Sequence, residues 1–204
     1  LWRCAGDCDP SELQRRFGAS ARAESLWPDQ LTADPLEEIR QASLTLPKEQ
    51  SLVLLGFRGT RLRDPDRDTL DVLAMVLSGM SGRLFQAVRE QQGLSYTLGA
   101  SSVPGWDPGF FVVYAATRPE ERQRVMATLL EQLEAFAKTG PTEEEVDLAK
   151  RALIGAHRLD LQQLGGLAKR CALDELYGLG YDAWTTYESR LRAVTIAQLQ
   201  DAAA

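Results

Sequence analysis

The chain has 204 residues, of which 44% are hydrophobic and 25% are charged, and its formal net charge is −6. This length and composition suit a globular protein with a sizeable core, in one large domain or two small ones. The acidic balance argues against a nucleic-acid-binding protein, which usually carries a basic surface. No apolar run approaches the length that a membrane-spanning helix needs.

The first residues predict a strand end followed by a short helix. Residues 1–5 are typical of the end of a strand, and Asp9 with Pro10 begins a helix that ends near Phe17. Residues 19–35 indicate a loop or linker. Because the sequence starts with Leu1 in mid-strand and ends inside a helix, we expect it to be a fragment of a longer protein.

Four further segments predict strands. The apolar residues of 39–46 alternate in part, and residues 52–55 are continuously apolar. Residues 94–101 alternate cleanly, residues 110–114 form another apolar run, and the Gly- and Pro-rich residues 105–109 join these two strands as a hairpin.

Helices account for most of the rest of the chain. One begins at Asp64-Pro65, a short one spans about 82–91, and a third opens at Pro119 and ends at Gly140. Thr142 and Glu145 have the spacing of a capping box and predict the start of a long fourth helix. From residue 167 onward the pattern predicts helical hairpins that break at residues 178–180. The order of elements favours a single α+β domain over 1–204, with a mostly antiparallel sheet covered by helices on one face.

The sequence contains few recognisable catalytic motifs. The zinc-peptidase motifs H-E-x-x-H and H-x-x-E-H both need two histidines, and the chain has one, His157. We therefore expect no histidine-based zinc site in this chain, and we expect His157 to be an exposed or half-buried helix residue. No G-x-S-x-G elbow, P-loop or dinucleotide fingerprint is present.

The three cysteines do not form a disulfide framework, because their number is odd and small. We expect reduced thiols, with Cys171 in a helix core. A metal site from Cys4, Cys8 and Cys171 would lack the paired C-x-x-C spacing. The cysteines do not fix the cellular compartment.

Residues 78–100 carry the most specific pattern in the chain, and residues 78–96 read S-G-M-S-G-R-L-F-Q-A-V-R-E-Q-Q-G-L-S-Y. This stretch resembles the segment G-G-x-x-S-R-L-F-x-x-x-R-E-x-x-G-L-x-Y of the M16 (pitrilysin, insulinase and mitochondrial processing peptidase-like) zinc metallopeptidase family. The matching residues are Gly79, Ser81, Arg83, Leu84, Phe85, Arg89, Glu90, Gly93, Leu94 and Tyr96.

The resemblance extends over nearly the whole chain. Residues 5–13 are similar to the family's domain-opening G-D-v-d-p-e-e-L, and residues 142–150 are similar to its t-e-e-E-l-e-r-a-K helix start. Val194 and Thr195 match its closing a-V-T segment. Gly82 replaces the usual Ser before Arg83, and Cys8 replaces a common aliphatic residue.

The resemblance implies an α+β fold of the LuxS/MPP-like metallohydrolase type, in the second, non-zinc domain of one half of the peptidase. Two such halves close around a chamber, and the zinc ion is bound by another domain of the complete enzyme, not by this chain. The implied partners are the zinc-bearing half, on the same chain or as a separate subunit, and a peptide or unfolded protein substrate. No nucleic acid and no membrane span are implied. The resemblance also assigns Arg89 and Tyr96, seven residues apart, to the substrate.

The chemistry of this pair is reasonable for peptide hydrolysis. A tyrosine hydroxyl can donate a hydrogen bond to the oxyanion formed at the scissile carbonyl, and an arginine can hold backbone carbonyls with several donors. Two structural alternatives stay open at this point. Arg89 can simply complement a helix dipole, and Tyr96, in phase with Leu94 and Leu98, can be an ordinary sheet residue. In the second domain of the zinc-bearing half, a similar pair would be structural.

The leading hypothesis is that this chain is a substrate-binding, chamber-forming domain of a zinc endopeptidase. Two other functions compete with it. The fold also serves as a non-catalytic core or assembly subunit in respiratory complexes. An independent peptide-binding module is less favoured, because an open half-chamber buries little ligand surface. The isolated chain is predicted to be inactive because it lacks the zinc-binding motif.

Overall fold

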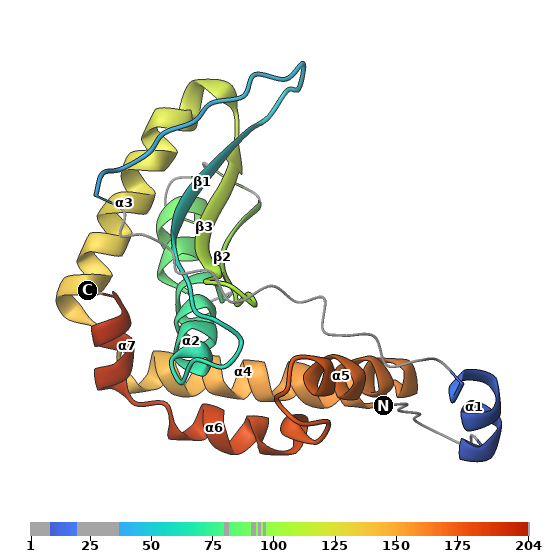
Figure 1. The fold of residues 1–204 in the computed structure, drawn as a ribbon. Coiled ribbons are helices and arrows are strands. Elements are labelled where there is room, and N and C mark those ends of the chain that lie inside the picture. The colour runs from blue at the N-terminus through green and yellow to red at the C-terminus, as the bar shows by residue number, and fades with distance from the viewer. Residues whose placement is uncertain are drawn as a thin grey trace.

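The computed structural model describes residues 9–19, 37–79, 82–90, 93, 95 and 97–203. Figure 1 shows a small sheet flanked by long helices, with α1 set apart from the other elements. The elements in chain order are α1 (Pro10–Phe17), β1 (Ser51–Arg58), α2 (Arg67–Ser78), η1 (Phe85–Glu90), β2 (Thr97–Val103), β3 (Phe110–Thr117), η2 (Pro119–Glu121), α3 (Arg122–Thr139), α4 (Glu143–Leu161), α5 (Leu164–Leu176), η3 (Ala183–Thr186), α6 (Tyr187–Ala193) and α7 (Ile196–Ala203).

The sheet is antiparallel and has the strand order β1-β3-β2. Leu98 of β2 and Val53 of β1 lie opposite Ala115 of β3, and Ala100 lies opposite Val113. These side chains point to one face, because the side chains of a strand alternate between the two faces. The predicted hairpin over 105–109 is confirmed, and the apolar run at 52–55 is confirmed as part of β1.

Helices cover one face of this sheet, as expected for the predicted α+β class. α2 packs against β2 and α4, and α3 packs against β1 and β3. The core between them is apolar, and its most completely buried large side chains are Phe136, Leu77, Leu84, Leu129, Leu191 and Leu199. On the opposite face Leu52 and Leu54 remain 60% and 59% exposed.

Most of the predicted helix ends are confirmed. Asp9 caps α1 by accepting a hydrogen bond from the Ser11 backbone N–H. α3 ends at Gly140, whose φ of +66° is costly for any residue with a side chain. α2 begins at Arg67, slightly later than the Asp64-Pro65 signal, and Cys171 is half-buried on α5 and not in the core.

One strand prediction is wrong. Residues 39–46 form no strand, and Ile39 and Leu44 are 90% and 82% exposed. Within the described residues no backbone hydrogen bond joins 37–47 to a strand, and a strand exists only through such bonds to a neighbour. The predicted strand end at 1–5, Cys4, Cys8 and nearly all of the predicted loop at 19–35 lie outside the described residues.

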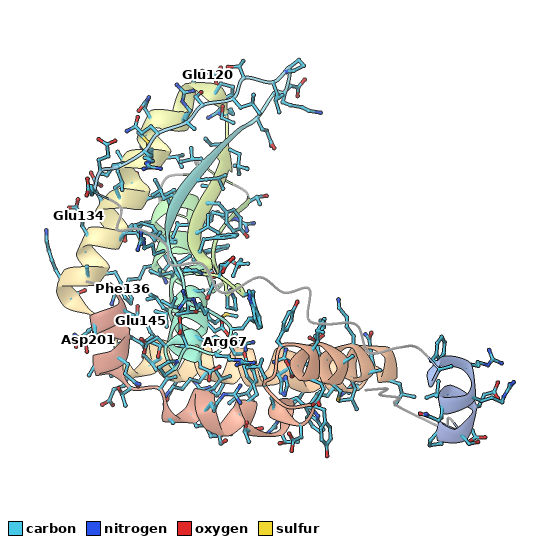
Figure 2. All side chains as sticks on the ribbon, viewed as in Figure 1. Arg67, Glu120, Glu134, Phe136, Glu145 and Asp201 are labelled. Atoms are coloured by element: carbon cyan, nitrogen blue, oxygen red, sulfur yellow. The ribbon has the colours of Figure 1, made fainter. Side chains whose placement is uncertain are left out.

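Arg83 connects the segment before η1 to the junction of α3 and α4. Its Nε and Nη2 donate to the two carboxylate oxygens of Glu145 at 2.8 and 3.0 Å, and Nη2 also donates to the Gly140 carbonyl at 2.8 Å. Its Nη1 donates to the Thr139 hydroxyl at 3.0 Å, and the guanidinium lies 5.1 Å from the centre of the Phe136 ring. Figure 2 places Phe136 and Glu145 together at this junction.

Glu145 takes part in both the ion pair with Arg83 and the N-terminal cap of α4. Its Oε2 accepts the Thr142 backbone N–H at 2.7 Å, and the Thr142 hydroxyl accepts the Glu145 N–H at 3.2 Å, so the predicted capping box of α4 is confirmed. The hydrogen bonds from Arg83 hold the pKa of Glu145 below its usual range, with a smaller contribution from Thr142. The side chains of Arg83 and Glu145 are 23% and 26% exposed, so water screens this pair less than a surface pair.

A second set of interacting charged side chains lies near the start of α2. Asp71 is half-buried, and burial raises its pKa to about 6. Arg67 and Arg170 act in the opposite direction, and Asp68 adds to the rise. Burial likewise raises the pKa of Tyr187 to about 12, and the charges of Asp71 and Asp68 add to this rise.

The Arg83–Glu145 pair should contribute to stability more than a surface ion pair. We expect a double-mutant cycle with Arg83→Met and Glu145→Gln to give a coupling of about 1–2 kcal/mol in urea unfolding. Glutamine at 145 keeps an acceptor for the Thr142 N–H, so the cycle separates the ion pair from the helix cap. The same cycle on the exposed pair Arg158–Glu188 is the control, with about 0.5 kcal/mol expected. Equal couplings for the two pairs would contradict the anchoring role.

Asp71 should make the free energy of unfolding fall as the pH rises. Its folded pKa of about 6 lies above its ordinary value of 3.8, so the folded state favours the protonated carboxyl group. This stabilisation is complete below pH 3.8 and is lost as the pH rises through 6. We therefore expect Asp71→Asn to raise the free energy of unfolding at pH 7.5 by about 1–3 kcal/mol more than at pH 4.5. Asp147→Asn, an exposed aspartate on α4, should show no such difference, and a pH-independent effect at Asp71 would refute this expectation.

Candidate functional site

The first member of the predicted pair, Arg89, lies on a helical segment with one buried side. Arg83 and Leu84 begin this segment, and η1 continues it in π-helical geometry. Leu84, Ala87 and Val88 are buried, whereas Arg89 is exposed. π-helical turns are rare and are often found at functional sites. The predicted helix over 82–91 is therefore confirmed in its described part, and it presents Arg89 at the surface.

Arg89 is held along the outside of its own helix. Its guanidinium carbon lies 4.8 Å from the centre of the Phe85 ring, four residues earlier. A cation above an aromatic face at an exposed site contributes about 0.5–1 kcal/mol. Such a contact orients the guanidinium along the helix surface.

The chain leaves this helix through Gly93. The Gly93 N–H donates to the Arg89 carbonyl at 3.0 Å, and the φ of Gly93 is +63°. A left-handed residue at this point closes the end of the helix. A β-carbon on Gly93 would meet nothing within 4 Å, so it is the backbone conformation alone that favours glycine here.

Ser95 connects the segment before β2 to the sheet by hydrogen bonds. It is 4% exposed, and its hydroxyl lies 2.8 Å from the Thr97 carbonyl and 2.6 Å from the Ala116 carbonyl of β3. One hydroxyl proton is thus shared between two acceptors at the start of β2. The sequence analysis did not single out Ser95, and its only signal was a small polar residue inside an alternating run.

Tyr96, the second member of the predicted pair, lies outside the described residues. In the sequence it stands between Ser95 and Thr97, both of which are fixed against β3. The structure therefore gives the setting of Arg89 and the residues that flank Tyr96, and the joint role of the pair stays a prediction.

The described residues contain no cluster of His, Cys, Asp or Glu side chains able to hold a metal ion. His157 lies on α4, where its ring centre is 4.6 Å from that of Tyr187 and its Nε2 is 3.2 Å from the Trp184 carbonyl oxygen. The prediction of a half-buried helix residue is confirmed. No helix in the described part of the chain is both long enough and apolar enough to span a bilayer.

Comparison with known proteins gives a consistent match. A family model described as the peptidase M16 inactive domain matches residues 5–153. An uncharacterized zinc protease of Streptomyces coelicolor is 37% identical over 129 residues, which are 63% of this chain and 28% of that protein. An uncharacterized zinc protease of Mycobacterium bovis is 36% identical over 147 residues, which are 72% of this chain and 33% of that protein. The chain thus spans about a third of the length of these curated relatives.

Solved structures share the fold. A protease from Helicobacter pylori has a TM-score of 0.84 at 17% identity, covering 98% of this chain and 50% of that one. The peptidase M16 inactive domain from Pseudomonas fluorescens has a TM-score of 0.69 at 24% identity, covering 77% of this chain and 37% of that one. A chain of complex III2 from Candida albicans also has a TM-score of 0.69, at 15% identity, covering 77% of this chain and 40% of that one.

The family model covers more than half of the chain, and it includes the η1 segment and Gly93, which belong to the motif over 78–100, together with the hairpin over 105–109. Relatives named as zinc proteases agree with it, and the fold matches that of solved M16 inactive domains. The chain belongs to the M16 peptidase family and contains the domain that the family model describes as inactive.

Proposed function

We propose that this chain is a substrate-binding, chamber-forming domain of an M16-type zinc endopeptidase, and that Arg89 and Tyr96 act on the substrate. The observation that carries the proposal is the exposed Arg89 on a π-helical turn whose other side is buried and whose start is fixed by Arg83. The names of the relatives support the peptidase activity of the complete protein.

The metal would come from another part of the complete enzyme. This chain has one histidine and cannot form a two-histidine site alone. A zinc ion at such a site supplies an activated water for peptide hydrolysis. The residues of this chain would contribute binding and orientation, which place the scissile carbonyl in line for attack.

Arg89 and Tyr96 would divide this work between them. A guanidinium with several fixed donors suits the backbone carbonyls of a bound peptide, which are present before and during the reaction. A phenol hydroxyl near the scissile carbonyl would donate to the oxyanion, which is fully formed only after attack. The Arg89 contact would stabilise the bound substrate and the transition state equally, whereas the Tyr96 contact would stabilise the transition state selectively.

A non-catalytic core or assembly subunit is the alternative function. The fold likeness to a chain of complex III2 is consistent with it, but fold alone does not decide function. The decisive feature is whether the complete protein or its partner subunit carries an H-x-x-E-H motif, because without that motif the peptidase hypothesis fails.

Tyr96→Phe in the complete enzyme should lower kcat and kcat/KM together, by about 10²-fold, because it removes one donor to the oxyanion. Zinc content and thermal unfolding should stay unchanged. Tyr181→Phe, which removes the hydroxyl of an exposed tyrosine elsewhere, should have no effect on turnover. Unchanged kinetics for Tyr96→Phe would remove its proposed role.

Arg89→Gln should act mainly on KM. Losing charged hydrogen bonds to substrate carbonyls should raise KM about 10–100-fold and change kcat less, since these bonds exist in ground and transition states alike. The control is Arg151→Gln, an exposed arginine on α4, with steady-state kinetics on a peptide substrate. A fall in kcat at constant KM would instead assign Arg89 to the transition state, and no change would exclude it from the site.

A further inference from the structure

The backbone around Arg89 is held on three sides. The Arg83–Glu145 ion pair fixes the helical segment before this residue, and the Gly93 N–H donates to the Arg89 carbonyl at 3.0 Å after it. The buried apolar residues of the segment hold it against the core. What remains to be fixed is the arginine side chain, whose several rotatable bonds allow many conformers at an exposed position.

The Phe85 ring lies where it restricts those conformers. The guanidinium carbon of Arg89 lies 4.8 Å from the centre of this ring, and Phe85 itself is half-buried beside the fully buried Leu84. A phenylalanine has few rotamers, and partial burial reduces them further. The ring is therefore a fixed support for a side chain that would otherwise sample many positions.

An aromatic face suits this task chemically. It attracts a cation through the ring quadrupole, and unlike a carboxylate it accepts no in-plane hydrogen bond from the guanidinium. Arg83 shows the contrast within the same segment. Its guanidinium also lies over a ring, that of Phe136 at 5.1 Å, but its donors are taken up by Glu145 and the α3–α4 junction, as suits a structural anchor.

We propose, on the basis of the proposed function, that Phe85 is a positioning residue for Arg89. Its ring holds the guanidinium along the helix surface before the peptide binds. Side-chain order that already exists in the free enzyme is not lost on binding, so the ring strengthens substrate binding through Arg89. The effect falls on KM, because the backbone carbonyls that Arg89 would hold are present in the ground and transition states alike.

Steady-state kinetics of the complete enzyme on β-casein, an unfolded protein, test this role. Phe85→Leu removes the ring and should raise KM about 2–5-fold with kcat nearly unchanged, which is the strength of an exposed cation–π contact. Phe85→Met, a second variant without a ring, should behave in the same way. Phe85→Tyr keeps the ring and should restore the KM of the unaltered enzyme. The control is Phe17→Leu on α1, which is set apart from the other elements (Figure 1).

A double-mutant cycle with Arg89→Gln separates positioning from a purely structural effect. If the ring acts through the guanidinium, Phe85→Leu should change KM no further once Arg89→Gln is present. A structural disturbance of the segment would persist in the double variant and would lower kcat as well. The positioning role is wrong if Phe85→Leu leaves KM unchanged, if it raises KM equally in both backgrounds, or if Phe85→Tyr raises KM as much as Phe85→Leu.

The same measurements keep this inference distinct from the proposed function. If Arg89→Gln raises KM and Phe85→Leu does not, Arg89 binds the substrate without help from the ring, and only the positioning role is refuted. If Arg89→Gln itself has no effect on KM or kcat, Arg89 is not part of the site, and both the positioning role and the proposed role of Arg89 are refuted.

Discussion

The bidentate contact between Arg83 and Glu145 is the constraint on which the candidate site depends. It joins segments 62 residues apart, because one guanidinium reaches a carboxylate, a hydroxyl and a helix-end carbonyl at the α3–α4 junction. Arg89 follows six residues later on the same helical segment, so the rotation of that segment about its axis is set at Arg83. The buried side chains of Leu84 and Val88 then leave Arg89 on the outside. The position of Arg89 is thus fixed by the Arg83–Glu145 contact together with the buried apolar side of the segment.

Local features of the fold could be predicted because their causes are local. Thr142 and Glu145 have the spacing of a capping box, and both hydrogen bonds are present. Gly140 was expected at the end of α3, and its φ is positive. The alternating run and the Gly-rich turn predicted the β2–β3 hairpin. At the site, the pattern of residues 82–91 correctly placed Arg89 on a helix, whereas its predicted role toward the substrate came from the family resemblance.

Other features could not be predicted because they depend on distant partners. The alternation in residues 39–46 indicates that one side of the segment is more apolar than the other. It carries no information on whether a neighbouring strand is available for pairing, and the predicted strand was therefore wrong. The charged run before α2 gives no sign that Asp68 is buried, because its partner Arg190 stands near the other end of the chain. Ser95 carried no signal beyond its size and polarity, and its bonds to β3 become visible only when the two strands are paired. Tyr96 lies outside the described residues, so its part in the site rests on the motif.

The proposed function divides the work of one enzyme between a metal held elsewhere and the Arg89 guanidinium and Tyr96 phenol of this domain. The most direct test is an experimental structure of the complete protein with an uncleaved peptide bound in its chamber. The account predicts that the guanidinium of Arg89 and the hydroxyl of Tyr96 each lie about 3 Å from carbonyl oxygens of that peptide, on the side opposite the metal. A peptide bound productively at the metal, with both side chains turned toward solvent or toward this domain's own core, would contradict it.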